Sequence, residues 1–257
     1  MKIPSVIEML KAGVHFGHQI SRWHPKMEDY IFTERNGVHV INLEITRKKL
    51  EETLETARAM AAEGKQILFV TTKPQAKEIV KAAAIDCGMP YLVERWIGGL
   101  LTNFVEMKKL FKKYLSLKEQ QASGELERYT KQEQSRIIKE LEKKEKNLAG
   151  IAYLEKIPDA LFVPALQREI TAVEEANRMS VPIIGICDTN ADPGRAQYII
   201  PANDDAVNAI KMIVGLVAEA IKEGRAEYER NAKKEVVKDK HVVAAKKTTS
   251  KKEVDWN

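Results

Sequence analysis

The chain has 257 residues, of which 44% are hydrophobic and 31% are charged, and its formal net charge is +5. That length can bury a substantial core, whereas the net charge is modest for a protein that binds a polyanion. The longest uninterrupted apolar stretches, among them 181–187, are far shorter than the roughly 18 residues of a membrane span, and no secretory signal pattern begins the chain. We therefore expect a soluble cytoplasmic protein, with Cys87 and Cys187 as buried free thiols because they lack the spacing of a redox pair or a metal finger.

Positive charge is concentrated at the two ends of the sequence. Residues 232–257 hold eight lysines against four acidic residues, and the first 49 residues hold eight Lys or Arg against five Asp or Glu. Contact with nucleic acid would therefore use local patches, and the first 49 residues form one of them. The tail 226–257 has no sustained periodicity and is expected to be disordered until it binds a partner.

The first predicted element is a short helix after Ser5. Ser5 and Glu8 form a capping-box pattern at its start, and Gly13 supplies its end. The stretch 13–42 that follows contains four histidines, three glycines, several cations and several aromatic side chains, with almost no helical periodicity. This composition is typical of a surface that grips structured RNA, because cations contact phosphates and flat rings stack on bases.

Strands and helices alternate through most of the remaining sequence. Short strands are expected at 30–33 and 38–41, on either side of the hairpin signal Asn36-Gly37. Continuous apolar runs, typical of strands covered on both faces, then alternate with segments of helical periodicity. The expected strands are 66–71, 91–93, 161–163, 183–186 and 198–200, and the expected helices are 50–61, 74–88, 169–179 and one capped by Asp204 or Asp205. This order predicts an α/β fold, a Rossmann-like and mainly parallel sheet with helices on both faces.

One interval, 102–154, breaks the alternation. Apolar residues spaced by three and four lie on both sides of Ser123-Gly124, and charged residues fill most other positions. The spacing predicts an antiparallel helical hairpin of the coiled-coil type, with Thr102 as the cap of its first helix. We expect it to be inserted into a single α/β domain made of 1–101 and 155–225; a charged helix pair with no partner is the alternative.

A series of motifs runs from residue 7 to residue 224. They are AGVHFGH, RW.PKM and YIFTERNGVHVI near the amino end, ERWIGGLLTN before the expected hairpin, and DTNADP and PANDDA after the last two strands. Together they resemble the S-two family of bacterial small-ribosomal-subunit proteins. The chain departs from the family pattern at 162–167, which lacks the usual Asp-Pro, at Ala191, where cysteine is common, and at Ala202, where glycine is common.

The resemblance implies a structural protein of the small ribosomal subunit and not an enzyme. Its partners would be folded small-subunit rRNA, neighbouring ribosomal proteins and, in some bacteria, the mRNA-binding protein S-one, with no membrane, small-molecule substrate or cofactor. Binding would rest mainly on phosphate contacts and RNA shape. The residues expected to contact rRNA are Arg22, Trp23, His24, Lys26, Arg35, Asn36, Lys73, Arg95, Asn103, Lys108 and Lys109.

Acidic residues after the last two strands leave other functions open. Because ligands of open α/β sheets gather outside the carboxyl ends of the strands, Asp188 and Asp205 could converge there with His18. Carboxylates and imidazole could then hold a divalent ion, so these three residues are candidate metal ligands. The main rival is an α/β enzyme acting on a nucleotide or sugar phosphate, although the sequence lacks phosphate-loop glycines and an assembled nucleophile and base. The second rival is an adaptor whose helical hairpin binds protein.

Overall fold

A five-stranded parallel sheet lies at the centre of the structure, a computed structural model that describes residues 3–252, with side chains placed over 3–126 and 128–231. The strand order is β5-β4-β6-β7-β8, and every neighbouring pair is parallel. The strands are β4 (Ile67–Val70), β5 (Tyr91–Leu92), β6 (Ala160–Val163), β7 (Ile183–Cys187) and β8 (Tyr198–Pro201). The predicted α/β class is confirmed.

Helices cover both faces of this sheet because its strands are apolar on both sides. In β4, Ile67 and Phe69 enter one hydrophobic core, while Leu68 and Val70 enter the other, as the alternation of side chains along a strand requires. The first core is closed by α2 (Leu43–Ala62), α3 (Pro74–Cys87) and α7 (Val207–Lys252), and the second by α6 (Ile170–Arg178) and residues 96–111. Both cysteines are free and buried, as expected.

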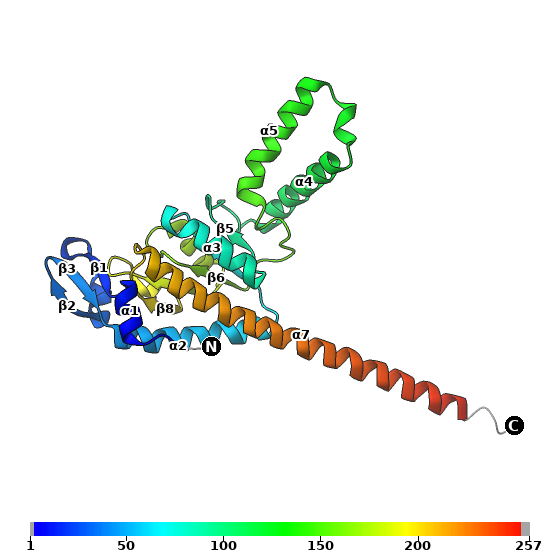
Figure 1. The fold of residues 1–257 in the computed structure, drawn as a ribbon. Helices are drawn as coiled ribbons and strands as arrows, with labels where there is room; N and C mark the ends of the chain where they lie inside the picture. The colour runs from blue at the N-terminus through cyan, green and yellow to red at the C-terminus, as the bar shows by residue number, and fades with distance from the viewer. Residues whose placement is uncertain (1–2, 253–257) are drawn as a thin grey trace.

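Helices α2 and α7 lie side by side along the first core (Figure 1). The approach is so close that a Cβ on Gly224 would collide with the backbone of Arg58, so glycine is required there. Helix α2 begins well before residue 50 because Asn42 Oδ1 accepts the backbone N–H groups of Glu44, at 3.0 Å, and Ile45, at 3.5 Å. Across residues 3–252, no helix has the length and apolar character that crossing a membrane demands.

Helix α7 continues through Lys252, whereas disorder was expected from residue 226. A Cβ on Gly64 would lie only 2.8 Å from the ring of Tyr228, closer than van der Waals contact, so this part of α7 packs tightly against the body. The expectation of disorder is wrong for 226–231, because Ala, Glu and Arg favour helix and no Gly or Pro interrupts the segment. The side chains after Asn231 and the whole of 253–257, with Trp256, lie outside the described residues.

A second, smaller sheet lies at the amino end, after the short helix α1 (Val6–Ala12). Its strands β1 (Phe16–Gln19), β2 (Ile31–Arg35) and β3 (Val38–Ile41) are antiparallel in the order β1-β3-β2. The 3-10 helices η1 (Ile20–Arg22) and η2 (Pro25–Tyr30) connect β1 to β2. The turn between β2 and β3 has positive φ at Asn36 (53°) and Gly37 (76°), as the hairpin signal predicts. Strand β1 was not predicted.

The small sheet is fastened to the carboxyl end of the large one. Thr189, just after β7, accepts the backbone N–H of His18 at Oγ1 (2.8 Å) and that of His24 at its carbonyl (2.7 Å). Asn203, just after β8, donates its backbone N–H to the Val14 carbonyl at 3.0 Å. Residues more than a hundred positions apart thus form one joint.

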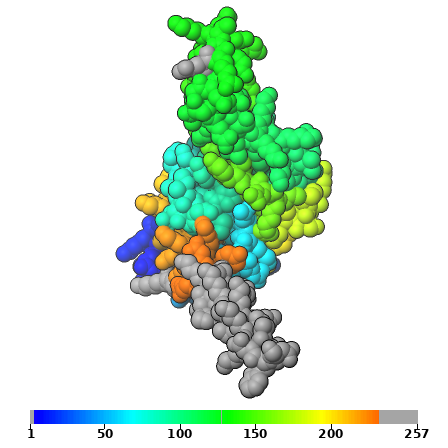
Figure 2. Space-filling view, turned by 90° about the vertical axis from the view of Figure 1, so that its right-hand side faces the viewer, coloured from blue at the N-terminus to red at the C-terminus, as the bar shows by residue number. Residues whose placement is uncertain are grey.

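Helices α4 (Phe104–Ala122) and α5 (Lys131–Leu148) fill most of 102–154 and are joined through η3 (Glu125–Arg128). They stand away from the sheet, and Figure 2 shows them rising above the body as a narrow column. Buried side chains from both helices, among them Phe111, Tyr114 and Leu141, connect the pair to the second core. Thr102 does not cap α4; its hydroxyl donates to Glu175 instead. Coiled-coil geometry and the domain boundaries remain predictions.

Candidate nucleic-acid interface

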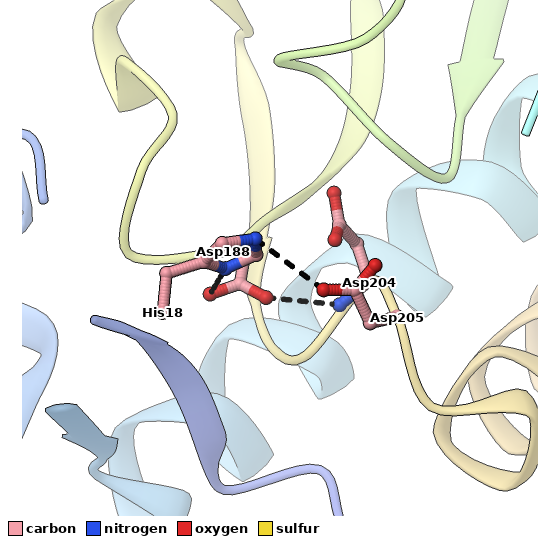
Figure 3. Close-up of side chains that lie close together, drawn as sticks. All are labelled: His18, Asp188, Asp204 and Asp205. Atoms are coloured by element: carbon pink, nitrogen blue, oxygen red, sulfur yellow. Dashed lines mark hydrogen bonds and ion pairs between the residues drawn. The ribbon is translucent and has the colours of Figure 1, made fainter. Parts of the chain in front are cut away.

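Three segments bring an imidazole and three carboxylates together where the two sheets meet. His18 comes from β1, Asp188 follows β7, and Asp204 and Asp205 precede α7 (Figure 3). His18 Nδ1 lies 3.1 Å from Asp188 Oδ1, and His18 Nε2 lies 3.3 Å from Asp205 Oδ2. One ligand atom from each of the four residues falls within 4.8 Å of the others. The expected convergence of His18, Asp188 and Asp205 is therefore confirmed, and Asp204 is the additional member.

Lys73 occupies this acidic cluster as its internal counter-ion. Its Nζ lies 2.7 Å from Asp204 Oδ1 and 2.7 Å from Asp205 Oδ1, and the residue is only 8% exposed. This geometry contradicts the expectation that Lys73 offers its amine to an RNA phosphate. The physical reason is that Asp204 lies against the turn after β4, so the nearest anions are the protein's own carboxylates.

Proton equilibria in the acidic cluster reflect burial and these ion pairs. Burial, followed by the charge of Asp188, raises the pKa of Asp204 to about 6, although Lys73 acts against this shift. Contact with Asp188 raises the pKa of His18 in spite of partial burial, and the other two carboxylates add to it. Burial favours a lower pKa for Lys73, but Asp204 and Asp205 hold it above its ordinary value. A divalent ion would therefore have to displace Lys73 and the proton of His18.

The predicted residues of the small sheet lie close together, but their side chains are not equally available. Arg22, Arg35 and Asn36 are exposed, and neither arginine forms an ion pair with any side chain described in the structure. Lys26 is also exposed, but its Nζ lies 3.1 Å from both carboxylate oxygens of Asp192.

The aromatic members of the same group are partly used inside the protein. The Trp23 ring is half-buried, with its centroid 5.2 Å from that of His39. His24 Nδ1 accepts the backbone N–H of Lys26 at 3.3 Å, which caps η2. The freely presented groups of this face are consequently the two arginines and Asn36.

The remaining predicted contacts form a separate group near the base of α4. Arg95 and Asn103 are exposed there. Lys108 Nζ donates to the Glu155 carbonyl at 3.0 Å, and Lys109 Nζ pairs with Glu106 Oε1 at 2.6 Å. Arg95 follows β5, one edge of the large sheet, whereas the small sheet docks beside β7 and β8 at the other. The structure therefore divides the predicted residues into two patches.

Comparison with known proteins finds similarity over a range that includes both sheets. The family model described as ribosomal protein S2 matches residues 9–224. The chain belongs to the ribosomal protein S2 family. It is 48% identical over 225 residues to the small ribosomal subunit protein uS2 of Fusobacterium nucleatum subsp. nucleatum, an alignment that covers 87% of this chain and 91% of the relative. The resemblance inferred from the motifs is confirmed.

In this member of the ribosomal protein S2 family, Glu175 of α6 organises the turn that leads into α4. Its Oε1 accepts Trp96 Nε1–H at 3.0 Å and the Gly99 backbone N–H at 2.8 Å. Its Oε2 accepts the backbone N–H groups of Leu101, at 3.2 Å, and Thr102, at 3.4 Å. Burial opposes ionisation, but these donors together hold the pKa of Glu175 below its ordinary value. Sequence reasoning missed this residue; the only signal was a glutamate beside the apolar positions Val173 and Ala176.

Metal binding by the acidic cluster stays a prediction. Metal analysis of the purified protein tests it, since a stoichiometric ion would support the prediction and its absence would count against it.

Proposed function

We propose that this protein is a structural constituent of the small ribosomal subunit that binds folded rRNA through the exposed cations of its amino-terminal sheet. The observation that carries the proposal is the pair Arg22, at the end of η1, and Arg35, at the end of β2, both exposed with no carboxylate partner among the described side chains. Guanidinium groups in that state offer their full charge and several N–H donors to phosphate oxygens.

The arrangement of the charged side chains supports RNA binding better than it supports catalysis. The groups that an enzyme would use are paired inside the protein: Lys73 pairs with Asp204 and Asp205, and His18 pairs with Asp188 and Asp205. A general base or nucleophile needs a lone pair directed at a substrate, whereas these atoms face other side chains of the protein. We therefore infer a non-enzymatic protein, without a cofactor or a small-molecule substrate.

The partners follow from the same inference. They are small-subunit rRNA and neighbouring ribosomal proteins, and the place of action is the ribosome in the cytoplasm. Contact with the mRNA-binding protein S-one rests on the family resemblance alone. Cosedimentation of tagged S-one with reconstituted subunits, with and without this chain, tests it.

The central experiment replaces Arg22, Lys26 and Arg35 by alanine and measures binding to small subunits depleted of this protein at several salt concentrations. Because each lost phosphate contact removes released counter-ions, the slope of log affinity against log salt should fall by about two to three. Lys26 should contribute least, since Asp192 already neutralises it.

The matched control replaces Arg178 and Lys211, two exposed cations away from the small sheet. Its salt slope should equal that of the unmodified protein. An unchanged slope in the triple variant would refute the assignment of this face.

A further inference from the structure

A pocket of about 500 Å³ opens between the turn after β5 and the hairpin. Its apolar side chains are Trp96, Ile97, Leu110 and Leu148, contributed by the turn, by α4 and by α5. Trp96 is held in place because its Nε1–H donates to Glu175, so this wall does not depend on an occupant. The volume falls within the range of pockets that enclose small organic groups.

The rim of the pocket carries positive charge that the protein does not neutralise. Arg95 and Lys143 line it and form no ion pair or side-chain hydrogen bond with the side chains that the structure describes. Glu140 is the one carboxylate among the lining residues, and its Oε1 lies 2.7 Å from Lys144 Nζ. Two cations therefore remain in excess, and an anionic occupant would balance them.

The positive rim continues along α5 towards the tip of the hairpin. A second hollow is lined by Arg136, Lys139 and Lys143, together with neutral polar side chains and the same Glu140. Spacings of three and four residues place these three cations on one face of the helix. A chain of phosphates could follow this stripe and enter the pocket at Lys143.

We propose that the pocket binds one unpaired nucleotide of the rRNA, with the base against Trp96, Ile97 and Leu110 and the flanking phosphates on Arg95 and Lys143. The inference rests on the proposed function and names a second RNA site, separate from the small sheet. Unpaired bases present a flat apolar face and a charged backbone, and the pocket combines an apolar wall with unbalanced cations. An apolar protein side chain would cover the apolar wall of the pocket but would bring no negative charge to Arg95 and Lys143.

The first test is direct ultraviolet crosslinking of reconstituted small subunits, followed by identification of the crosslinked peptides. The expected result is a nucleotide attached to the peptide that contains Trp96 and Ile97. A bifunctional lysine reagent that joins Lys143 to a neighbouring protein, with no nucleotide on that peptide, would overturn the proposal in favour of a protein occupant.

The second test closes the pocket without straining the backbone. A Cβ on Gly98 would meet no atom within 4 Å, and the φ angle of Gly98 is not positive, so Gly98→Leu can be accommodated while its side chain fills the pocket. We expect about fivefold or greater loss of affinity for depleted subunits, since stacking of one base contributes at least that much. Gly215→Leu, at another glycine with open space around it, is the matched control and should bind normally.

A third variant separates the two RNA sites. Arg95→Ala combined with Lys143→Ala should lower the salt slope by about one to two. Normal affinity and slope in both pocket variants, with loss in the Arg22, Lys26 and Arg35 variant, would overturn this inference alone. Failure of the unmodified chain to bind depleted subunits would instead overturn the proposed function.

Discussion

Two contact regions in this protein, here called joints, hold carboxylates largely away from water: one lies between the two sheets and one at the base of the hairpin. The two joints stabilise their carboxylates in different ways. At the meeting of the two sheets, Asp204 is 3% exposed and pairs with the cation of Lys73. At the base of the hairpin, Glu175 is half-buried and accepts neutral N–H donors from Trp96, Gly99, Leu101 and Thr102. The first joint depends on balancing whole charges, and the second on the alignment of dipoles around one charge. They should therefore respond differently to substitution and to pH.

Removing the cation from the joint between the two sheets should have the largest effect on the free energy of unfolding. Lys73→Met leaves the buried Asp204 without its counter-ion and leaves Asp205 with His18 alone, and should lower the free energy of unfolding by about 3–5 kcal/mol in denaturant titrations. Lys77→Met is the matched control on the same helix, since Lys77 pairs with Glu94 at the surface, and it should cost about 1 kcal/mol or less. Adding Asp204→Asn to Lys73→Met should restore part of the loss; equal losses in the two lysine variants would contradict this picture.

Removing the charge from the second joint should have a smaller and more local effect. Glu175→Gln keeps the shape but turns an amide towards N–H donors, and should lower the free energy of unfolding by about 2 kcal/mol. Hydrogen exchange at the amides of Gly99, Leu101 and Thr102 should accelerate. Glu174→Gln, at the exposed neighbouring position, should leave both quantities unchanged, and uniform acceleration across the sheet would argue against a local joint.

Asp204 and His18 in the first joint should respond to pH with the opposite sign to Glu175, whereas Asp205, whose pKa is lowered, acts in the same direction as Glu175. The raised pKa values of Asp204, to about 6, and His18 mean that the folded state binds more protons, so their contribution to stability is lost as pH rises from about 4 through 6 and beyond. The lowered pKa of Glu175 contributes stability that is lost as pH falls below its ordinary titration range. Urea titrations at several pH values should show that Asp204→Asn reduces the loss of stability as pH rises. Glu175→Gln should reduce the loss of stability as pH falls. A pH profile that neither variant alters would refute the assignment.

Features set by local sequence patterns were predicted better than features set by pairing between distant residues. The large sheet was predicted because runs such as 67–70 are apolar at every position, which suits a strand buried on both faces. The convergence of His18 with Asp188 and Asp205 followed from the rule that parallel strands end at one edge. Strand β1 was missed because Gly17, His18 and Gln19 have little strand propensity and its pairing with β3 is irregular between Phe16 and Gln19.

The candidate RNA contacts show the same limit. Sequence reasoning selected cations by type and position, but it could not tell which were already paired within the protein. Lys73 meets Asp204 across 131 positions and Lys26 meets Asp192 across 166, so neither pairing leaves a local signal. Arg22 and Arg35 resemble those lysines in the sequence, yet only the folded arrangement distinguishes the available cations from the neutralised ones.

The bonds from Thr189 and Asn203 to residues 14–24 have a consequence for how the protein is made. During synthesis the small sheet leaves the exit tunnel first, but its anchoring partners near residues 189 and 203 emerge only after most of the chain. The contact between the two sheets is therefore completed late, although its amino-terminal half is translated first. A polypeptide that ends before residue 189 lacks these anchors, so the small sheet can be joined to the large one only after most of the chain has been made.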